Sequence, residues 1–406
     1  MTERLYYADS YLRRFEATVL ESLAWRARPA IVLSRSAFYP TGGGQPHDTG
    51  YLQNLPVVEV VEREADKAVI HILKKELPHL AAGDTLTGEV DWPRRFDHMQ
   101  QHTGQHILSR AAEQLWDAAT VGFHLGAKAS TIDLNRAPLT AEQLDRLEDE
   151  ANHIVFENRP VTASFVGQEE LDALPLRKPP TVSGPVRIVE VRDFDWSPCG
   201  GTHVSAAGEV GLIKIVGAER RGSETRLEFL CGTRALMDYR LKNRNLLDLA
   251  SCLSVGYWEL PEAVERLEKE ARTQRKAARA AQDRLLDFEA QLLVSQAEAL
   301  GEFLLVKQVF QDRSLEKVKH LALKLSQQHG CVALLGLAGD KGHLVFAAPP
   351  SSGHDLRPIL GQACAVIEGG GGGRPHLAQG GGPIGETEAI QKALDIAAQC
   401  LFVSSQ

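Results

Sequence analysis

Two short segments carry side chains that can bind a metal ion, and each places two of them four residues apart. In the segment QHTGQH the pair is His102 and His106, and in PCGGTH it is Cys199 and His203. On a helix, side chains four residues apart share one face. Three imidazoles and a thiolate are ligands that Zn²⁺ prefers. The two segments together therefore predict one zinc site per chain, with these four residues as ligands.

Plainer structural interpretations of the same residues stay open. A histidine pair on a helix can simply be packed or solvated, and Cys199 alone could be a buried thiol. Four donors of suitable type favour the metal site. The sequence has no H-E-x-x-H of a zincin, no C-x-x-C of a zinc ribbon, no G-x-S-x-G and no P-loop lysine motif.

The first pair needs a helix, which is predicted to begin at Trp92 because Pro93 suits a first turn. Its apolar stripe consists of Leu108, Ala111, Ala112 and Leu115, and His98, His102 and His106 form a second stripe beside it. A predicted strand at 186–191 leads to the second pair.

Around these two elements the pattern predicts further strands and turns. Residues 123–126 are expected to form a turn and 130–134 a strand. Residues 210–216 and 226–230 are expected to form a hairpin, whose tip at 218–223 is basic and exposed.

Residues 1–91 contain short alternating segments separated by turns, which predict a small β-barrel. The segments are 15–20, 30–34, 57–61, 68–73 and 85–91. Gly42, Gly43 and Gly44 lie between them in PTGGGQPHDTG. Three consecutive glycines are costly inside a strand, so a mobile loop is expected. The loop is either a flexible turn or a place where bare backbone approaches a ligand.

The second half of the chain changes character twice. Residues 236–300 are strongly helical in pattern and predict a long arm, read either as a coiled coil with a solvated polar face or as an arm that contacts a partner. Residues 301–406 alternate strands and helices and predict a compact α/β domain. Its glycine-rich segment 369–382, with Arg374 in the middle, is either a low-complexity loop or a loop that cradles phosphate.

The overall composition predicts a soluble protein of two to four domains. The chain has 406 residues, 43% hydrophobic and 24% charged, and no signal peptide or long apolar run is found. A cytoplasmic location is expected, with the six single cysteines as free thiols. The net charge of −8 argues neither for nor against nucleic acid as a partner.

Four motifs in this order resemble long-form AlaX proteins, free-standing relatives of the editing and C-terminal parts of alanyl-tRNA synthetase. They are Thr41–Gln45 with Asp48 and Gly50, His102–His106, Cys199–His203, and Gly371–Pro375 with Ala378–Gly382. The resemblance implies an α+β multidomain chain. Its expected parts are a β-barrel at 1–91, a zinc editing domain with an antiparallel sheet at 92–235, a helical arm at 236–300 and a DHH-associated-like α/β domain at 301–406.

The resemblance also implies an activity, which is hydrolysis of mischarged tRNA(Ala), typically seryl- or glycyl-tRNA(Ala). In the family, zinc is bound by the residues matching His102, His106, Cys199 and His203. The C-terminal part contacts tRNA and the helical arm often dimerises, so a homodimer through either part is expected, with no membrane association. Because the chain starts at the barrel, it is not expected to charge tRNA.

Several residues receive hypothetical roles in ester hydrolysis. Thr103, Gln105 and Gln45 are candidates for contacts to the zinc ligands or to the substrate. The loop Gly42–Gly44, Arg221 and Arg374 are candidates for binding the tRNA. Four protein ligands would close a tetrahedral site, whereas catalytic zinc usually keeps one position open. Zinc is therefore expected either to lose one ligand or mainly to orient the aminoacyl-adenosine end.

Three alternatives remain. One is a non-catalytic module that binds tRNA or dimerises and keeps a structural zinc. Another is an editing enzyme for a different substrate such as seryl-tRNA(Thr), because both zinc half-sites occur in that branch too. A metallopeptidase is more distant, since no glutamate base lies between the paired histidines.

Overall fold

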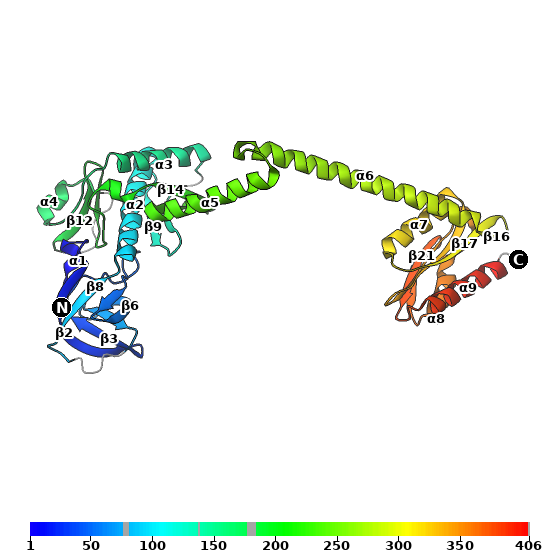
Figure 1. Cartoon of the computed structure of the whole chain (residues 1–406), viewed down its shortest axis with the longest axis horizontal. Coiled ribbons are helices and arrows are strands. Elements are labelled where there is room, and N and C mark those ends of the chain that lie inside the picture. Colours follow the sequence, from blue (N-terminus) through cyan, green and yellow to red (C-terminus); the bar gives the residue numbers. More distant parts are fainter. Residues whose placement is uncertain (76–80, 137–138, 177–183, 405–406) are drawn as a thin grey trace. The chain divides into compact units, whose positions relative to one another are not determined.

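In the computed structural model the chain divides into two units, Met1–Cys252 and Leu253–Gln406 (Figure 1). The described residues are 1–75, 81–136, 139–176 and 184–404. The predicted arm at 236–300 spans the division between the units. Each unit is described separately below.

The first unit begins with a closed barrel of six strands, as predicted, in the order β2-β3-β7-β6-β5-β8. Every neighbouring pair in it is antiparallel. The strands are β2 (Arg14–Trp25), β3 (Arg28–Leu33), β5 (Gly50–Leu52), β6 (Leu55–Glu62), β7 (Val69–Leu73) and β8 (Thr85–Val90). Alternating residues such as Phe15, Ala17 and Val19 fill the interior, which is why the two-residue period identified these strands. Ahead of β2, β1 (Glu3–Arg4) pairs with β4 (Arg35–Ser36), and α1 spans Leu5–Ala8.

Helix α2 (Trp92–Trp116) follows the last barrel strand directly (Figure 1). The Asp91 side chain accepts a hydrogen bond from the Arg94 backbone and Pro93 occupies the first turn, which together fix the start of the helix. Asp117, in the left-handed conformation, ends it. The helix is buried along most of its length, so its histidine face and its apolar face are both covered.

Two sheets and two further helices surround α2. The four-stranded sheet has the order β14-β15-β10-β9 and the three-stranded sheet the order β11-β12-β13, all antiparallel as predicted. The strands are β9 (Thr120–Leu125), β10 (Ser130–Leu134), β11 (Val161–Val166), β12 (Val186–Val191), β13 (Asp195–Pro198), β14 (Ile213–Arg221) and β15 (Glu224–Cys231). The helices are α3 (Ala141–Phe156), α4 (Gln168–Ala173) and the short η1 (Ala207–Val210). The first unit closes with most of α5 (Gly232–Leu253).

Two predictions in this region are wrong in detail. Residues 123–126 do not form a turn, because Phe123 to Leu125 complete β9, where they pair with β10. Val210 is not in a strand but ends η1, and the hairpin strand starts at Ile213.

The second unit contains a six-stranded sheet in the order β16-β17-β18-β19-β21-β20. Only β17 and β18 are parallel, as α7 crosses between them. The strands are β16 (Glu298–Leu300), β17 (Phe303–Phe310), β18 (Cys331–Leu337), β19 (Gly342–Ala347), β20 (Gly370–Arg374) and β21 (Leu377–Gly382). The helices are α6 (Leu260–Ser295), α7 (Leu315–Gln328), α8 (Leu356–Val366) and α9 (Thr387–Ser404), with short turns η2 (Tyr257–Glu259) and η3 (Pro350–Ser352). Adjacent residues of β18, Leu334 and Leu335, enter two different cores, so both faces of the sheet are covered.

The glycine-rich segment is not a loop, which corrects that expectation. Gly370–Arg374 and Leu377–Gly382 pair as an antiparallel hairpin at the edge of the sheet. Glycine is required there by close packing: a Cβ on Gly380 would lie 2.4 Å from Cys364 Sγ. Nor is the predicted arm one helix, since it is interrupted at 254–259 and its last residues form β16.

Among the described residues, no helix is both long enough and apolar enough to cross a membrane.

Candidate metal centre and substrate site

The structure brings His102, His106, Cys199 and His203 together, although the two pairs lie nearly a hundred residues apart. One ligand atom from each residue lies within 4.8 Å of every other. Helix α2 supplies the first pair, and the connection that follows β13 supplies the second. All three histidines are at least 95% buried. The sequence-predicted donor set is therefore one cluster.

Each imidazole uses its Nδ1 atom for a hydrogen bond outside the cluster. His102 Nδ1 lies 2.8 Å from Gln45 Oε1, His106 Nδ1 lies 3.0 Å from Asp195 Oδ2, and His203 Nδ1 lies 3.1 Å from Thr103 Oγ1. A carboxylate or carboxamide oxygen accepts, so the nitrogen facing it carries the proton. In His102 and His106 the Nε2 lone pair is then left for the cluster, the arrangement that partners of metal-binding histidines usually impose. The Thr103 hydroxyl beside His203 can donate or accept.

Two distances inside the cluster match those of a tetrahedral ion. Cys199 Sγ lies 3.5 Å from His102 Nε2 and 3.3 Å from His203 Nε2. Ligands around a tetrahedral zinc, with Zn–S of about 2.3 Å and Zn–N of about 2.0–2.1 Å, stand roughly 3.5 Å apart. The donor types, their tautomers and their spacing thus all suit Zn²⁺.

Two glycines let the backbone come close to the cluster. A Cβ on Gly201 would lie 2.2 Å from His102 Cε1, so only glycine fits beside this imidazole. Gly44 has a φ of 83°, and a Cβ there would lie 2.8 Å from Phe123 Cδ1. The glycines of both motifs therefore serve close packing around His102, whose ring also stacks on Phe123.

The charge distribution in the cluster suits a cation. Burial alone would raise the pKa of the Cys199 thiol, but the neighbouring imidazoles of His102 and His203 hold it well below its usual range. Burial lowers the pKa of His203 to about 3. Burial also acts to lower the pKa of His106, yet the hydrogen bonds to Asp195 and Cys199 raise it to about 9. A thiolate and imidazoles are the forms that bind zinc, which competes with the His106 proton.

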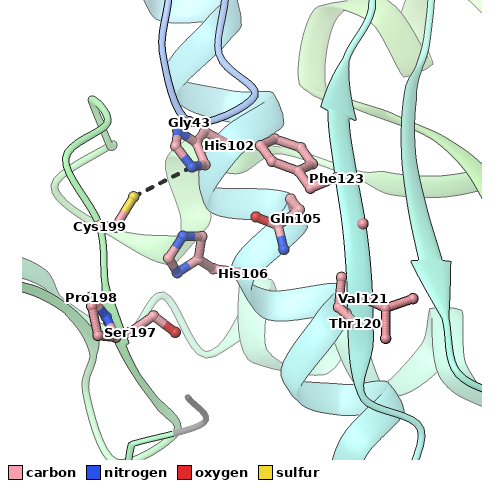
Figure 2. A pocket seen from close by; sticks show the side chains of 11 residues that line it. Gly43, His102, Gln105, His106, Thr120, Val121, Phe123, Ser197, Pro198 and Cys199 are labelled. Carbon is pink, nitrogen blue, oxygen red and sulfur yellow. Dashed lines mark hydrogen bonds between the residues drawn. The ribbon is translucent and has the colours of Figure 1, made fainter. Parts of the chain in front are cut away.

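A cavity of about 240 Å³ opens beside the cluster (Figure 2). Its wall includes three ligands, His102, His106 and Cys199, and the side chains Gln105, Thr120, Phe123 and Ser197. Figure 2 shows the Gln105 carboxamide oxygen turned toward the histidines. Gln105 Nε2 and Thr120 Oγ1 both donate to Ser109 Oγ, at 2.8 and 2.7 Å. The Thr120 oxygen can therefore accept a hydrogen bond from a small hydroxylated group in the cavity.

A second cavity, of about 370 Å³, adjoins the first. The two cavities share Gly43, His102, Pro198 and Cys199. The second is lined in addition by Arg4, Tyr6, Tyr7, Tyr39, Glu62 and the backbone of the glycine motifs.

The other predicted site residues line the first cavity, line the second cavity or lie outside both. Gln105 lines the first cavity, and Gly42 and Gly43 line the second. Gln45 and Thr103 line neither of these cavities and instead hold His102 and His203.

The two predicted arginines and His98 lie outside both cavities. Arg221 is at the exposed end of β14, paired with Glu219, and Arg374 is exposed at the end of β20 in the second unit. His98 is buried but outside the cluster, and its Nδ1 has no hydrogen-bond partner among the described residues.

Sequence reasoning missed Asp195, Thr120 and the tyrosine-lined second cavity. Asp195 lies four residues before Cys199 and could have been noticed as a carboxylate able to support a histidine ligand. Thr120 was not recognised as a site residue because part of β9 was predicted to be a turn. The tyrosines are distant in sequence from the zinc motifs, so no spacing signal connects them.

Family models match three stretches of the chain. "Threonyl and Alanyl tRNA synthetase second additional domain" matches 186–228, "tRNA synthetases class II (A)" matches 10–94, and "DHHA1 domain" matches 301–401. The first stretch contains Cys199 and His203, and the third covers strands β17 to β21 of the second unit. These matches and the site define a protein related to the editing modules of aminoacyl-tRNA synthetases.

Relatives that match over most of their length narrow this class of proteins to one family. The chain is 31% identical to "Alanyl-tRNA editing protein AlaX-L" of Pyrococcus horikoshii, over 94% of each chain. It is 31% identical to "Alanyl-tRNA editing protein Aarsd1-B" of Xenopus laevis, over 86% of this chain and 84% of that one. The chain belongs to the alanyl-tRNA editing protein family and, with it, to the aminoacyl-tRNA hydrolases. It is also 32% identical to "Alanine--tRNA ligase" of Methanoregula boonei, but spans only 44% of that protein.

Proposed function

We propose that this protein is a zinc-dependent hydrolase that removes serine, and secondarily glycine, from mischarged tRNA(Ala). The observation that carries the proposal is the cluster of four metal-binding side chains, three of which line a small cavity. The cavity is small enough to select an amino acid, and its polar groups suit the hydroxyl of serine. Alanine lacks this hydroxyl and would leave the cavity's polar groups unpaired, which disfavours it relative to serine. Glycine is smaller than alanine, so steric exclusion would separate these two.

The ligands would be His102, His106, Cys199 and His203, one ion per chain. A zinc ion held there would polarise the ester carbonyl or orient the aminoacyl end, and with all four ligands bound it would need a fifth coordination position to contact substrate. Gln45 and Asp195 keep the imidazoles of His102 and His106 in the tautomer that binds metal, and Thr103 orients the ring of His203. These three are positioning residues.

The residues of the first cavity would handle substrate and water. The Gln105 oxygen, turned toward the histidines, can accept a hydrogen bond from a water beside the ester carbonyl. Thr120 can accept from the seryl hydroxyl, because its own proton is directed to Ser109. Phe123, stacked on His102, shields that side of the cluster from solvent. Gly42 and Gly43 let the loop approach the 3′ end of the tRNA.

The tRNA would contact both units. We assign Arg221 and Arg374 to the phosphate backbone, because both guanidinium groups are exposed at the ends of hairpin strands. A comparison of Ser-tRNA(Ala) with Ser-tRNA(Thr) tests the choice of tRNA. Faster deacylation of Ser-tRNA(Ala), lost in His106→Ala, is expected. Preference for Ser-tRNA(Thr) would favour the other editing branch, and zinc binding without hydrolysis of either would favour a non-catalytic module.

A homodimer through α6 completes the proposal. Apolar or small residues, with the polar Gln274 as the one exception, recur along α6 at alternating spacings of three and four, the pattern of a coiled-coil seam. The seam consists of Leu260, Val264, Leu267, Ala271, Gln274, Ala278, Ala281, Leu285, Phe288 and Leu292. Its large members at the C-terminal end, Leu285, Phe288 and Leu292, are 59–69% exposed. Such a seam needs a partner helix.

The order of residues in the seam favours a second copy in antiparallel orientation. When the helix is laid against itself reversed, Val264 meets Phe288 and Leu267 meets Leu285. Leu260 would stand opposite Leu292 but is already buried within its own chain. The small residues Ala271 and Ala281 then meet near the centre. A two-fold axis requires this kind of self-complementarity, in which large residues face large ones and small face small.

A further inference from the structure

A fully buried ion pair joins helix α2 to the end of the glycine loop (residues 39–48). Arg95 of α2 and Asp48 of the loop both have side chains without exposed surface. Arg95 Nε donates to Asp48 Oδ1 at 3.1 Å and to Oδ2 at 3.0 Å, and Arg95 Nη2 donates to Oδ2 as well. The metal cluster and the two cavities beside it are formed by other residues. The pair therefore acts on the site, if at all, through the residues that it holds.

The remaining donors of Arg95 hold two further segments of backbone. Arg95 Nη1 donates to the Ser10 carbonyl at 2.9 Å, and Nη2 donates to the Ala37 carbonyl. A guanidinium group is planar, so its donors keep fixed positions relative to one another. Arg95 thus fixes three segments of the chain against α2 at once, which the single nitrogen of a lysine could not do.

Asp48 also closes the base of the loop. Its Oδ2 atom accepts from the Tyr39 backbone N–H at 2.6 Å, and its own N–H donates to the Tyr39 carbonyl at 3.0 Å. At the tip, Gly42 and Gln45 exchange two backbone hydrogen bonds of 3.1 and 2.9 Å. The loop is therefore closed at its base and at its tip, and Arg95 fixes the base on α2.

The segment between base and tip carries the loop to the metal cluster. Gln45 Oε1 lies 2.8 Å from His102 Nδ1. Arg95 and His102 are both on α2 and lie seven residues apart, a rise of roughly 10 Å. Residues 45–48 can span at most about 10 Å. The loop thus lies along two turns of the helix and is attached at both ends, by the ion pair and by the bond to a metal ligand.

We propose that Arg95 and Asp48 are positioning residues that keep Gln45 in contact with His102. The pair fixes the base of the loop on α2, and the Gln45 oxygen then meets the His102 imidazole and holds its Nδ1 proton. Loosening the pair would leave a zinc ligand without support although no ligand is changed. This inference rests on the proposed function, because it takes the cluster to bind zinc.

Zinc affinity of the full chain, measured in a double-mutant cycle, tests the proposal without depending on catalysis. The variants are Asp48→Asn, Gln45→Ala and the two combined, compared by competition with a chromophoric chelator. Asparagine keeps the size of the side chain but loses the charge that pairs with Arg95. Asp133→Asn is the matched control, because Asp133 also accepts two hydrogen bonds from one arginine, Arg226, in the same unit and outside the cluster.

The expected pattern separates positioning from general stability. Asp48→Asn should weaken zinc binding about tenfold in the otherwise wild-type chain, since a histidine ligand loses its support. In the Gln45→Ala chain the same change should weaken zinc binding by less than about twofold, because the group through which Asp48 acts is already gone. A pair that only stabilised the fold would weaken zinc binding equally in both chains. Asp133→Asn should leave the affinity unchanged.

A second variant covers the case in which Asp48→Asn does not fold. An arginine left buried without its carboxylate is strongly destabilising, and circular dichroism and thermal unfolding would detect the loss of structure. Arg95→Lys then takes the place of Asp48→Asn in the cycle, because it keeps a positive charge beside Asp48 and loses the fixed fork. A several-fold loss of zinc affinity is expected, and again it should disappear in the Gln45→Ala chain.

Two results would overturn the proposal: zinc affinity unchanged by the substitution at the ion pair, or an equal loss with and without Gln45. Failure of the proposed function gives different observations. Wild-type protein that binds zinc but leaves Ser-tRNA(Ala) intact would contradict the proposed hydrolysis and leave this inference standing. Wild-type protein that binds no zinc would overturn both.

Discussion

Gln45 and Thr202 are joined by two hydrogen bonds that connect the glycine loop to the second metal motif. Gln45 Nε2 donates to Thr202 Oγ1 at 2.9 Å, and Gln45 Oε1 accepts from the Thr202 backbone at 3.1 Å. Because a backbone N–H can only donate, the second bond fixes which atom of the carboxamide is oxygen. That same oxygen faces His102 Nδ1 at 2.8 Å, which therefore carries the proton.

Gln45→Ala should consequently weaken zinc binding. Loss of a group that orients a histidine ligand typically costs 10–100-fold in metal affinity, and a loss of about that size is expected here. Competition with a chromophoric chelator measures the affinity. Gln114→Ala, an exposed change on the same helix α2 as His102, serves as the control. Equal zinc affinity in Gln45→Ala and wild type would show that His102 needs no support from the loop.

Thr120→Val should change the choice of amino acid. The substitution keeps the shape of the side chain but removes the oxygen proposed to accept from the seryl hydroxyl. We expect about 10–100-fold slower deacylation of Ser-tRNA(Ala), with Gly-tRNA(Ala) affected much less, because glycine offers no hydroxyl. Single-turnover rates on both substrates measure the ratio. An equal loss of the single-turnover rate on both substrates would mean that Thr120 supports the fold of the cavity and does not select serine.

The barrel should lose stability in acid because of His71. This side chain is fully buried in β7, its Nε2 lies 2.7 Å from Ser36 Oγ, and burial lowers its pKa to about 4. The unfolded chain binds this proton near pH 6.5, so its contribution is complete above pH 6.5 and is lost as the pH falls toward 4, by ~3 kcal/mol. Hydrogen exchange of β7 amides between pH 7 and 4.5 measures the loss. His71→Gln should show a smaller change over this range, and an unchanged dependence would place the effect elsewhere.

Phe288→Glu should abolish the proposed dimer. The antiparallel arrangement buries Phe288 against Val264 of the other copy, and a carboxylate there would lose its solvent. Sedimentation velocity is expected to give a dimer for wild type and a monomer for the variant. The control is Val403→Glu, an equally exposed apolar position on α9. A monomeric wild type would mean that the α6 seam is covered within the chain or by another protein.

The sequence predicted the elements where a periodic pattern was uninterrupted. The barrel strands and helix α2 follow from alternation and from Pro93, and the metal donors follow from residue type and spacing. Gly126, next to β9, and the glycines of β20 and β21 led to wrong predictions of a turn and a loop. Their role is close packing: a Cβ on Gly126 would lie 2.3 Å from the Ala129 carbonyl oxygen, and one on Gly380 would lie 2.4 Å from Cys364 Sγ. Asp195 supports a histidine ligand, and Thr120 and the three tyrosines line cavities. These roles depend on tertiary contacts, which one sequence does not reveal.

The most direct test of the central claim is deacylation of Ser-tRNA(Ala), run beside correctly charged Ala-tRNA(Ala), with zinc content measured on the same preparations. Wild type and Cys199→Ala should be compared, with Cys252→Ala as the control because Cys252 is an exposed cysteine outside the cluster. The account predicts about one zinc per chain and selective loss of serine in wild type and the control, with both lost in Cys199→Ala. Undiminished, selective deacylation by a zinc-free Cys199→Ala protein would contradict it.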